Sequence, residues 1–201
     1  PFQEIYQRNK EKRKKTMQGT KQFKVNIAGT DLVIETGLLA QQAAGAVTVS
    51  YGDTTVFTAV TNTDTPREGI DFFPLQCEYR EKFYAAGKFP GGFFKREARP
   101  TSKEILTARM CDRPIRPLFP DGYYNDVQVN STLIQSDGTR EADFLAVNAS
   151  SAALHISDIP FMGPIGCVRI GRIDGQWVIN PTHEQKAKSD IDLLYAGLRG
   201  K

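Results

Sequence analysis

Short stretches in which apolar and polar residues alternate, separated by turn residues, are the feature that most constrains the fold of this chain. Residues 23–27 alternate in this way, and residues 46–49 and 55–60 are further strand-like stretches with Tyr51, Gly52 and Asp53 between them. A period of two places every second side chain on the same face of a β-strand, and the intervening residues favour a tight turn. The pattern therefore predicts a β-hairpin with one buried face.

Two further hairpins and three single strands are predicted from the same signals. The hairpins pair residues 23–27 with 32–34 through Gly29, and residues 165–173 with 176–179 through Asp174 and Gly175; the single strands are 75–79, 127–134 and 191–196. Residues 63–74 and 83–100 are expected to be loops.

Two helices are predicted among these strands. Thr101 is followed three residues later by Glu104, which matches a capping box and predicts a helix start. Pro114 is expected to stop this helix, because proline lacks the N–H that the helical hydrogen bonds need. Residues 142–156 are rich in small and apolar side chains, which predicts a well-buried helix. Strands and helices are mixed rather than strictly alternating, so the predicted fold class is α+β.

Composition excludes several classes of protein. The net charge of +3 is too small to establish a nucleic-acid partner, so the distribution of charge has to decide that question. No run approaches the ~20 apolar residues that cross a bilayer, so we expect no membrane partner. Cys77, Cys111 and Cys167 are far apart and form no CxxC pair, which argues against a zinc ribbon or a disulfide framework. They fit a reducing compartment, and we expect a cytoplasmic protein, with an organellar relative as the alternative.

A basic segment rich in aromatic residues and glycine spans residues 83–116. Within it, Phe93 and Phe94 precede Lys95 and Arg96, and Arg99 follows closely. Exposed aromatic rings on a basic loop suit single-stranded RNA, because every base has a face to stack on and every phosphate a charge to pair. These five residues are the predicted RNA-binding site. The alternative is that both phenylalanines belong to the core and the basic side chains only face solvent.

Three further arginines follow on or just after the first predicted helix. Arg109 and Arg113 are four residues apart and share a helix face, and Arg116 lies shortly beyond them. All three are candidates for phosphate binding or for ion pairs with carboxylates such as Asp112, and ion pairing is the favoured interpretation.

Other candidate chemistry is weaker. Asp190 and Asp192 would share one face of a strand and could hold a hard cation such as Mg²⁺, although aspartate is also common where a strand begins. His155 in the second predicted helix and His183 in a polar loop are expected to be structural. The sequence contains neither a GxxxxGK[ST] phosphate loop nor a GxSxG nucleophile motif.

Several longer motifs resemble a known family. Residues 84–97 are YAAGKFPGGFFKRE and residues 112–120 are DRPIRPLFP; both resemble the first core domain of bacterial and organellar polynucleotide phosphorylases. Residues 71–75, 151–154 and 159–166 show the same resemblance, in the family's order. The resemblance implies a ribonuclease-PH-like fold, also known as ribosomal protein S5 domain 2-like, with a mixed sheet packed with helices. We expect a flexible basic leader at residues 1–19 and this core domain at 20–201, without its final helical part.

The resemblance also implies an activity for the parent protein. The family degrades RNA from its 3′ end with inorganic phosphate, releases nucleoside diphosphates, and can run the reaction in reverse. It implies a homotrimeric ring, a second ribonuclease-PH-like core domain that binds Mg²⁺, and single-stranded RNA gripped by a Phe-Phe-Arg-Arg-type loop. That loop corresponds to Phe93, Phe94, Lys95 and Arg96, with lysine replacing the first arginine. No cofactor is expected in this chain.

The family's serine-rich phosphate turn, found in the second core, corresponds here to residues 137–143. Glu141 and Asp143 stand near the serine positions, and their carboxylates would repel phosphate. We therefore expect no catalytic residue in this chain, which would hold RNA for another domain. The alternatives are a stand-alone ribonuclease-PH-type phosphorylase and a non-enzymatic RNA-binding or structural ring subunit.

Overall fold

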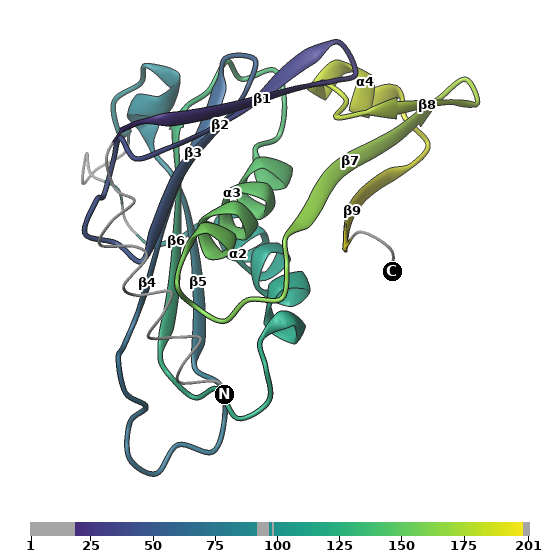
Figure 1. Ribbon diagram of the computed structural model, residues 1–201. Coiled ribbons are helices and arrows are strands. Elements are labelled where there is room, and N and C mark those ends of the chain that lie inside the picture. Colours follow the sequence, from purple (N-terminus) through teal and green to yellow (C-terminus); the bar gives the residue numbers. More distant parts are fainter. Residues whose placement is uncertain (1–18, 92–96, 98, 199–201) are drawn as a thin grey trace.

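The protein is described by a computed structural model that covers residues 19–91, 97 and 99–198. This part of the chain forms two β-sheets with helices between them (Figure 1). The larger sheet has the strand order β1-β2-β3-β4-β6-β5, and the smaller sheet has the order β8-β7-β9. Neighbouring strands are antiparallel except β5 and β6, which are parallel. The prediction of an α+β fold with a mixed sheet is confirmed.

The strands lie close to their predicted positions. Their bounds are β1 (Lys21–Ile27), β2 (Thr30–Thr36), β3 (Gly45–Tyr51), β4 (Thr54–Asn62), β5 (Leu75–Glu81), β6 (Val127–Gln135), β7 (Ile165–Ile173), β8 (Gln176–Ile179) and β9 (Asp192–Leu198). All three predicted hairpins form. In the β3–β4 hairpin, Gly52 adopts a φ of 60°, a left-handed conformation that glycine reaches without strain.

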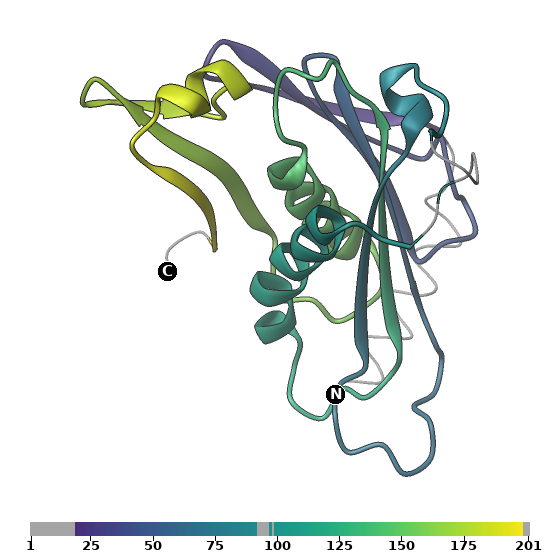
Figure 2. The same cartoon turned by 180° about the vertical axis from the view of Figure 1, so that it is seen from behind.

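Alternate residues of the larger sheet form its buried face, as a period of two predicts. Val47 and Val49 of β3 are buried, as are Val56 and Val60 of the neighbouring strand β4. The helices α2 and α3 lie on this face, and the smaller sheet lies on their far side (Figures 1 and 2). The core is therefore a layer of helices between two sheets.

Helix α2 (Ser102–Ile115) begins where the capping box predicts. The Thr101 hydroxyl accepts a hydrogen bond from the Glu104 N–H at 3.2 Å, and the Glu104 carboxylate accepts one from the Thr101 N–H at 2.7 Å. The prediction that Pro114 stops the helix is wrong by one residue, because Pro114 lies inside the last turn. At that position proline removes one hydrogen bond, and the N–H of Arg116 still reaches the Asp112 carbonyl. A short 3₁₀ turn, η2 (Arg116–Leu118), follows.

Helix α3 (Asp143–Ile156) is buried on most sides, as predicted. Its Asn148 side chain pairs with β7 like a neighbouring strand, donating to the Cys167 carbonyl at 2.7 Å and accepting from the Cys167 N–H at 3.0 Å. The hydroxyl of Ser151 accepts a further hydrogen bond from the Ile165 N–H at 2.8 Å. These contacts fix the smaller sheet against the helix layer.

A short helix, α4 (His183–Lys188), lies where a polar loop was predicted. Thr182 caps it and Gln185 completes a capping box, so the sequence contains a helix-start signal at the position where a loop is predicted. The prediction for His183 is corrected accordingly, since it is the first residue of this helix. None of the helices in the described ranges has the length and apolar character needed to span a bilayer.

Candidate nucleic-acid interface

The loop with the predicted RNA-binding residues joins β5 to α2. Phe93, Phe94, Lys95 and Arg96 lie outside the described residues, so their role stays a prediction. The fifth predicted residue, Arg99, is described and exposed on the approach to α2. The candidate site is therefore built from the two described ends of this loop.

A cavity of about 670 Å³, here called the loop cavity, lies between these ends. The end of β5, the first turn after it, the start of α2 and the end of β6 form its walls. Its lining residues are Arg80, Glu81, Lys82, Phe83, Ala85, Ala86, Lys88, Gly91, Glu97, Arg99, Thr101, Glu104, Leu133 and Ser136.

Not all of the basic side chains in the loop cavity are free to bind an anion. Lys82 pairs with the Glu97 carboxylate, and this hydrogen bond lowers the pKa of Glu97. Arg80, Lys88 and Arg99 form no ion pair with another described residue. These three cations can therefore attract phosphates without giving up an existing described ion pair.

Exposed aromatic rings stand beside these cations. Phe83 and Tyr84 belong to the 3₁₀ turn η1 (Phe83–Ala86) and are 44% and 60% exposed, and Phe89 just beyond it is 94% exposed. The turn is fixed to the end of β6, because Ala85 is buried and its carbonyl accepts a hydrogen bond from the Ser136 N–H at 2.8 Å. Rings presented on a fixed turn are able to stack on bases at a low cost in conformational freedom.

The three arginines on or just after α2 have different environments. Arg116 pairs with Asp112 at 2.7 Å and also donates to the carbonyl of Leu75 at 3.0 Å. Arg109 and Arg113 are exposed and form no ion pair within the described ranges. Arg116 is thus a structural ion-pair residue, whereas the other two are available to a ligand.

The turn at residues 137–143 is occupied by ion pairs of its own. The Glu141 carboxylate lies 2.9 Å from Lys103 Nζ, 3.6 Å from Lys186 Nζ and 3.9 Å from His183 Nδ1. Burial alone would raise the pKa of Glu141, but the hydrogen bond and charge of Lys103, with the charges of Lys186 and His183, hold it below its usual range. An incoming phosphate would have to compete with this carboxylate for the same cations.

The second carboxylate of the turn is also paired. Asp143 is buried and forms an ion pair with Arg169 of β7. The same guanidinium binds both oxygens of Asp192, at 2.6 and 2.7 Å, and its hydrogen bond lowers the pKa of Asp192. Arg169 therefore connects the start of α3 to the start of β9.

The two aspartates that were candidates for a cation site serve different arginines. Asp190 lies before β9 rather than in it, which corrects the expectation that both lie on one strand. It binds Arg172 through both carboxylate oxygens, whereas Asp192 binds Arg169. The described residues contain no cluster of three or more His, Cys, Asp or Glu side chains that could bind a metal ion. These aspartates do not fit a Mg²⁺ site.

Sequence comparison shows which family the chain belongs to. Residues 29–160 match the 3′ exoribonuclease family, domain 1, and residues 163–201 match domain 2 of that family. The boundary falls where the chain passes from α3 to β7. The chain is 58% identical over 166 residues to the polyribonucleotide nucleotidyltransferase of Methylacidiphilum infernorum. This alignment covers 83% of this chain and 24% of that protein. The chain is 57% identical over 173 residues to that of Thermomicrobium roseum, covering 86% and 22%.

The chain spans about a quarter of the length of these curated relatives, 24% and 22%.

Solved structures show the same fold at low identity. Rice Rrp46 aligns with a TM-score of 0.64 at 12% identity, over 92% of this chain and 76% of that one. An Archaeoglobus fulgidus exosome with RNA bound to its active site aligns with a TM-score of 0.64 at 14% identity, over 98% and 84%. The predicted resemblance to the first ribonuclease-PH-like core of polynucleotide phosphorylases is confirmed, and the chain belongs to the 3′ exoribonuclease family.

Proposed function

We propose that this chain is the RNA-holding core of a protein that degrades RNA from its 3′ end with inorganic phosphate and releases nucleoside diphosphates. The observation that supports this proposal most directly is the loop cavity, where three cations without a described ion pair stand beside exposed aromatic rings. The similarity to polyribonucleotide nucleotidyltransferases supports the reaction of the whole protein.

In this proposal the phosphates of a single RNA strand bind Arg80, Lys88 and Arg99. The bases stack on Tyr84 and Phe89, which are exposed on the same loop. Stacking contributes about 1–3 kcal/mol per base and tolerates any base, so the surface would hold RNA with little sequence preference. The resemblance supports the proposal that Phe93, Phe94, Lys95 and Arg96 also bind the RNA.

The chemical step is proposed to take place in a second ribonuclease-PH-like core domain. A phosphate oxygen attacks the phosphorus of the last linkage, and the 3′ oxygen of the preceding nucleotide leaves. Mg²⁺ would supply charge neutralisation there. In this chain, Glu141 already pairs with Lys103 and Lys186, so the chain would contribute no catalytic residue.

The assembly of the parent protein is proposed from the resemblance alone, and its location from the resemblance together with the cysteines. We propose a homotrimeric ring in which three copies of this surface face one RNA strand. A cytoplasmic location fits the free thiols of Cys77, Cys111 and Cys167, because a reducing compartment keeps cysteines unpaired.

The binding proposal is tested by measuring the affinity of the chain for a fluorescein-labelled single-stranded oligoribonucleotide. An exposed charge contact contributes about 0.2–1 kcal/mol, so the double variant Arg80→Ala with Arg99→Ala should bind about 2- to 30-fold more weakly. The matched control is Arg67→Ala, which removes an exposed charge that pairs with Asp126 at 2.6 Å outside the loop cavity. Equal losses in the control and the double variant, or no loss in the latter, would contradict the proposal.

The alternative functions have separate readouts. Incubating the chain with RNA and inorganic phosphate should release no nucleoside diphosphate, and robust release would favour a stand-alone phosphorylase. If the chain neither binds RNA nor releases products, a purely structural subunit is favoured instead.

A further inference from the structure

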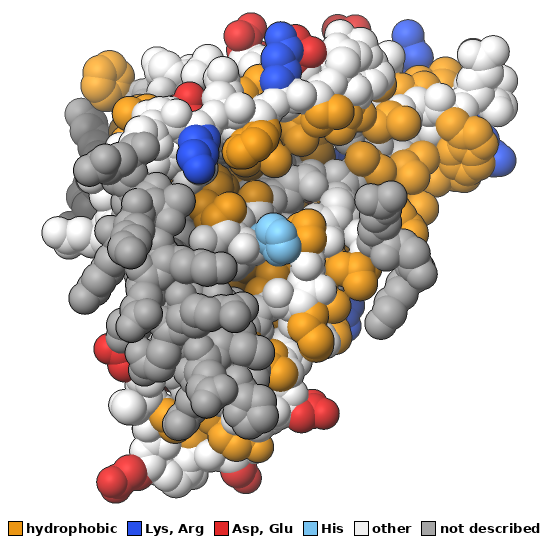
Figure 3. Space-filling view, viewed as in Figure 1, with side chains coloured by type: hydrophobic (Ala, Val, Ile, Leu, Met, Phe, Trp, Pro, Cys, Tyr) orange, Lys and Arg blue, Asp and Glu red, His pale blue; other side chains and the backbone are white. Residues whose placement is uncertain are grey.

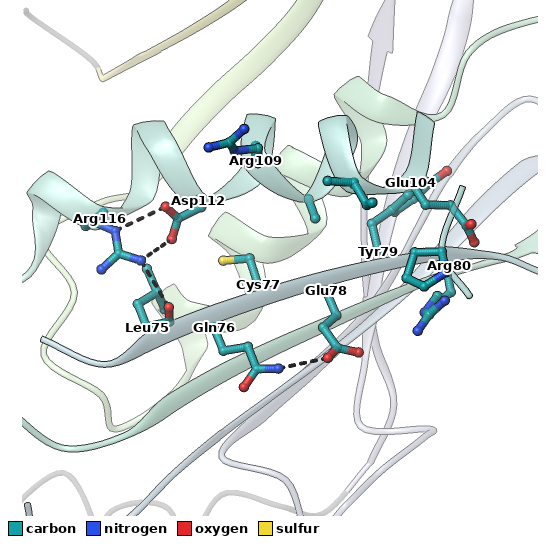
Figure 4. A pocket seen from close by; sticks show the side chains of 13 residues that line it. Leu75, Gln76, Cys77, Glu78, Tyr79, Arg80, Glu104, Arg109, Asp112 and Arg116 are labelled. Carbon is teal, nitrogen blue, oxygen red and sulfur yellow. Dashed lines mark hydrogen bonds and ion pairs between the residues drawn. The ribbon is translucent and has the colours of Figure 1, made fainter. Parts of the chain in front are cut away.

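The two outer strands of the larger sheet, β1 and β5, differ in how well their open sides are protected. At β5, Arg116 donates a hydrogen bond to the Leu75 carbonyl at 3.0 Å (Figure 4). The Glu81 N–H donates to the Glu104 carboxylate at 2.9 Å. Between these two contacts, Tyr79 is only 2% exposed. The open side of β5 is therefore closed to another chain.

Strand β1 is accessible along its length. Six of its seven residues are exposed, and the seventh, Ile27, is half-buried. Phe23 is 62% exposed and Val25 is 52% exposed. Strand β1 pairs with β2 on one side, and no described strand pairs with its other side. An edge strand with free backbone groups and exposed apolar side chains is a surface on which another extended chain is able to pair.

The turn between β1 and β2 determines which backbone groups of β1 point outward. Ala28 and Gly29 have φ values of 51° and 81°, as in a two-residue type I′ turn. The residues that flank such a turn, here Ile27 and Thr30, exchange both backbone hydrogen bonds. Because the direction alternates along a strand, the odd-numbered residues of β1 bond to β2. The residues that direct their N–H and C=O groups to the open side are Gln22, Lys24 and Asn26.

The apolar side chains of β1 lie on the face of the sheet that the helices partly cover. Phe23 is opposite Ile34 and Val25 is opposite Leu32 in β2. Leu32 is buried and Ile34 packs against the core, whereas the two β1 side chains remain exposed. Figure 3, viewed from the same side as Figure 1, shows hydrophobic side chains in the upper part of the molecule, where β1 and β2 lie. The apolar face of the sheet thus continues to its open edge.

The opposite face of β1 carries a lysine at the centre of the strand. Charged side chains, lysine above all, usually keep edge strands from pairing. Here the Lys24 ammonium forms an ion pair with Asp31 of β2 at 2.7 Å, and the Asn26 amide donates to the same carboxylate at 3.0 Å. The hydrogen bond from Lys24 lowers the pKa of Asp31, so the carboxylate stays ionised. The charge that would protect this edge is therefore offset within the same chain.

The sequence of β1 is complementary to itself. In an antiparallel pair of two β1 strands centred on Lys24, the outward-pointing residues form the hydrogen-bonded pairs. Gln22 then lies opposite Asn26 of the second copy. Phe23 lies opposite Val25 of the second copy at a position without backbone hydrogen bonds, where opposite side chains approach most closely. Apolar side chains meet on one face, and polar side chains meet on the other.

We propose that two copies of this chain associate through β1, in antiparallel register about a two-fold axis at Lys24. The backbone groups of Gln22, Lys24 and Asn26 pair across the axis, and Phe23 packs on Val25 of the other copy. A two-fold contact makes each of these interactions twice. The two larger sheets become one continuous sheet, and its outer strands are the protected β5 strands.

This inference goes beyond the proposed function and does not depend on it. None of the residues that line the loop cavity belongs to β1, so dimer formation can be measured without RNA. A two-fold axis is also distinct from the three-fold axis of the proposed ring, so the contact would be additional to the ring contacts. A chain that binds RNA but does not dimerise would contradict this inference alone.

The first test measures the mass of the chain by sedimentation velocity at increasing micromolar concentrations. The wild type should pass from monomer to dimer, because small interfaces dissociate in this range. Phe23→Lys places a charge at an apolar contact on both sides of the axis, so the dissociation constant of the dimer should increase at least about tenfold. The matched control is Phe72→Lys, which changes a phenylalanine that is 63% exposed outside β1 and should leave the dimer unchanged.

A cysteine at the two-fold axis tests the register. Lys24 lies opposite its own copy at a Cα separation of about 5.5 Å, which a disulfide is able to span. Lys24→Cys should therefore form a disulfide-linked dimer under mild oxidation. The control Gln22→Cys should not, because two residues on each side of the axis separate it from its copy by about 14 Å. The wild type, in which Cys77 is half-buried and Cys111 and Cys167 are buried, measures the background of cross-linking.

The proposal is overturned if the wild type stays monomeric over this range, or if Phe23→Lys and Phe72→Lys weaken the dimer equally. It is also overturned if Gln22→Cys cross-links as readily as Lys24→Cys, because the copies would then meet in another register or through another surface. Circular dichroism checks that each variant folds. If Phe23→Lys does not fold, the comparison of the two cysteine variants decides the question.

Discussion

Glu104 joins the start of α2 to the end of β5, and the Glu104→Gln variant tests this connection. One carboxylate oxygen accepts the Glu81 N–H at 2.9 Å. The other accepts the N–H and the hydroxyl of Thr101 at 2.7 and 2.9 Å. Burial alone would raise the pKa of Glu104, but the hydrogen bonds from Thr101 and Glu81 hold it below its usual range. The side chain is 7% exposed, so water cannot readily replace these partners.

Glutamine has the same shape but only one acceptor oxygen. In Glu104→Gln one of the two backbone N–H groups must face the amide NH₂ and lose its acceptor. An unsatisfied buried N–H costs about 1–3 kcal/mol, and losing a negative charge at a helix N-terminus costs about 0.5 kcal/mol more. We therefore expect a loss of about 2 kcal/mol in the free energy of unfolding, which lowers the Tm of a domain of this size by about 4–8 °C.

Urea denaturation followed by circular dichroism measures this loss. The matched control is Glu78→Gln on β5, where the exposed carboxylate bonds to the Gln76 amide; a surface change of this kind should alter stability by less than about 0.5 kcal/mol. If Glu104→Gln is as stable as the control, the bridge from α2 to β5 does not contribute as described.

Two further predictions concern packing and acid stability. A Cβ at Gly45 would lie 2.2 Å from the carbonyl oxygen of Ala153 in α3, so Gly45→Ala should lower the free energy of unfolding by more than about 3 kcal/mol. Gly166→Ala is the control and should be well tolerated, because there is open space around its Cβ. Equal urea midpoints for the two variants would contradict this prediction. Because the folded pKa of Glu141 lies below its ordinary value of 4.5, its stabilisation is complete at neutral pH and is lost as the pH falls below about 4.5. Urea midpoints should therefore be constant from about pH 6 to 8 and fall in acid. The Glu141→Gln variant should show a smaller fall. An unchanged acid profile in the variant would count against the pairing with Lys103.

Local signals in the sequence predicted most of the secondary structure. The capping box of α2 needs only Thr101 and Glu104, three residues apart, and the hairpins need only a turn between alternating stretches. The same kind of signal, Thr182 with Gln185, was present before α4. This signal is hard to recognise in the sequence, because a helix of six residues shows little apolar periodicity.

The electrostatic contacts could not be predicted, because the fold brings their partners together. Arg169 and Asp143 are 26 residues apart, and Arg169 and Asp192 are 23 apart. Nothing near either aspartate in the sequence indicates which arginine it meets. The sequence predicted that the carboxylates at 141 and 143 would disfavour phosphate, but the cations that pair with them emerge only from the packing of α2, α4 and β7.

The candidate site was predicted in part. Basic and aromatic residues of the 83–116 segment indicated RNA from their types alone. The sequence did not show that Glu97 neutralises Lys82 while Arg80, Lys88 and Arg99 form no ion pair with a described residue. That distinction depends on how the chain returns from β5 to the start of α2.

The most direct test of the RNA-holding claim is the salt dependence of the affinity for a single-stranded oligoribonucleotide. Each neutralised phosphate of a single strand contributes a slope of about −0.7 to the plot of log affinity against log salt. Arg80, Lys88 and Arg99 together predict a slope of about −2 or steeper, and the Arg80→Ala, Arg99→Ala double variant should make it shallower by about 1.4. A flat salt response, or an unchanged slope in the double variant, would contradict the claim that this surface holds RNA.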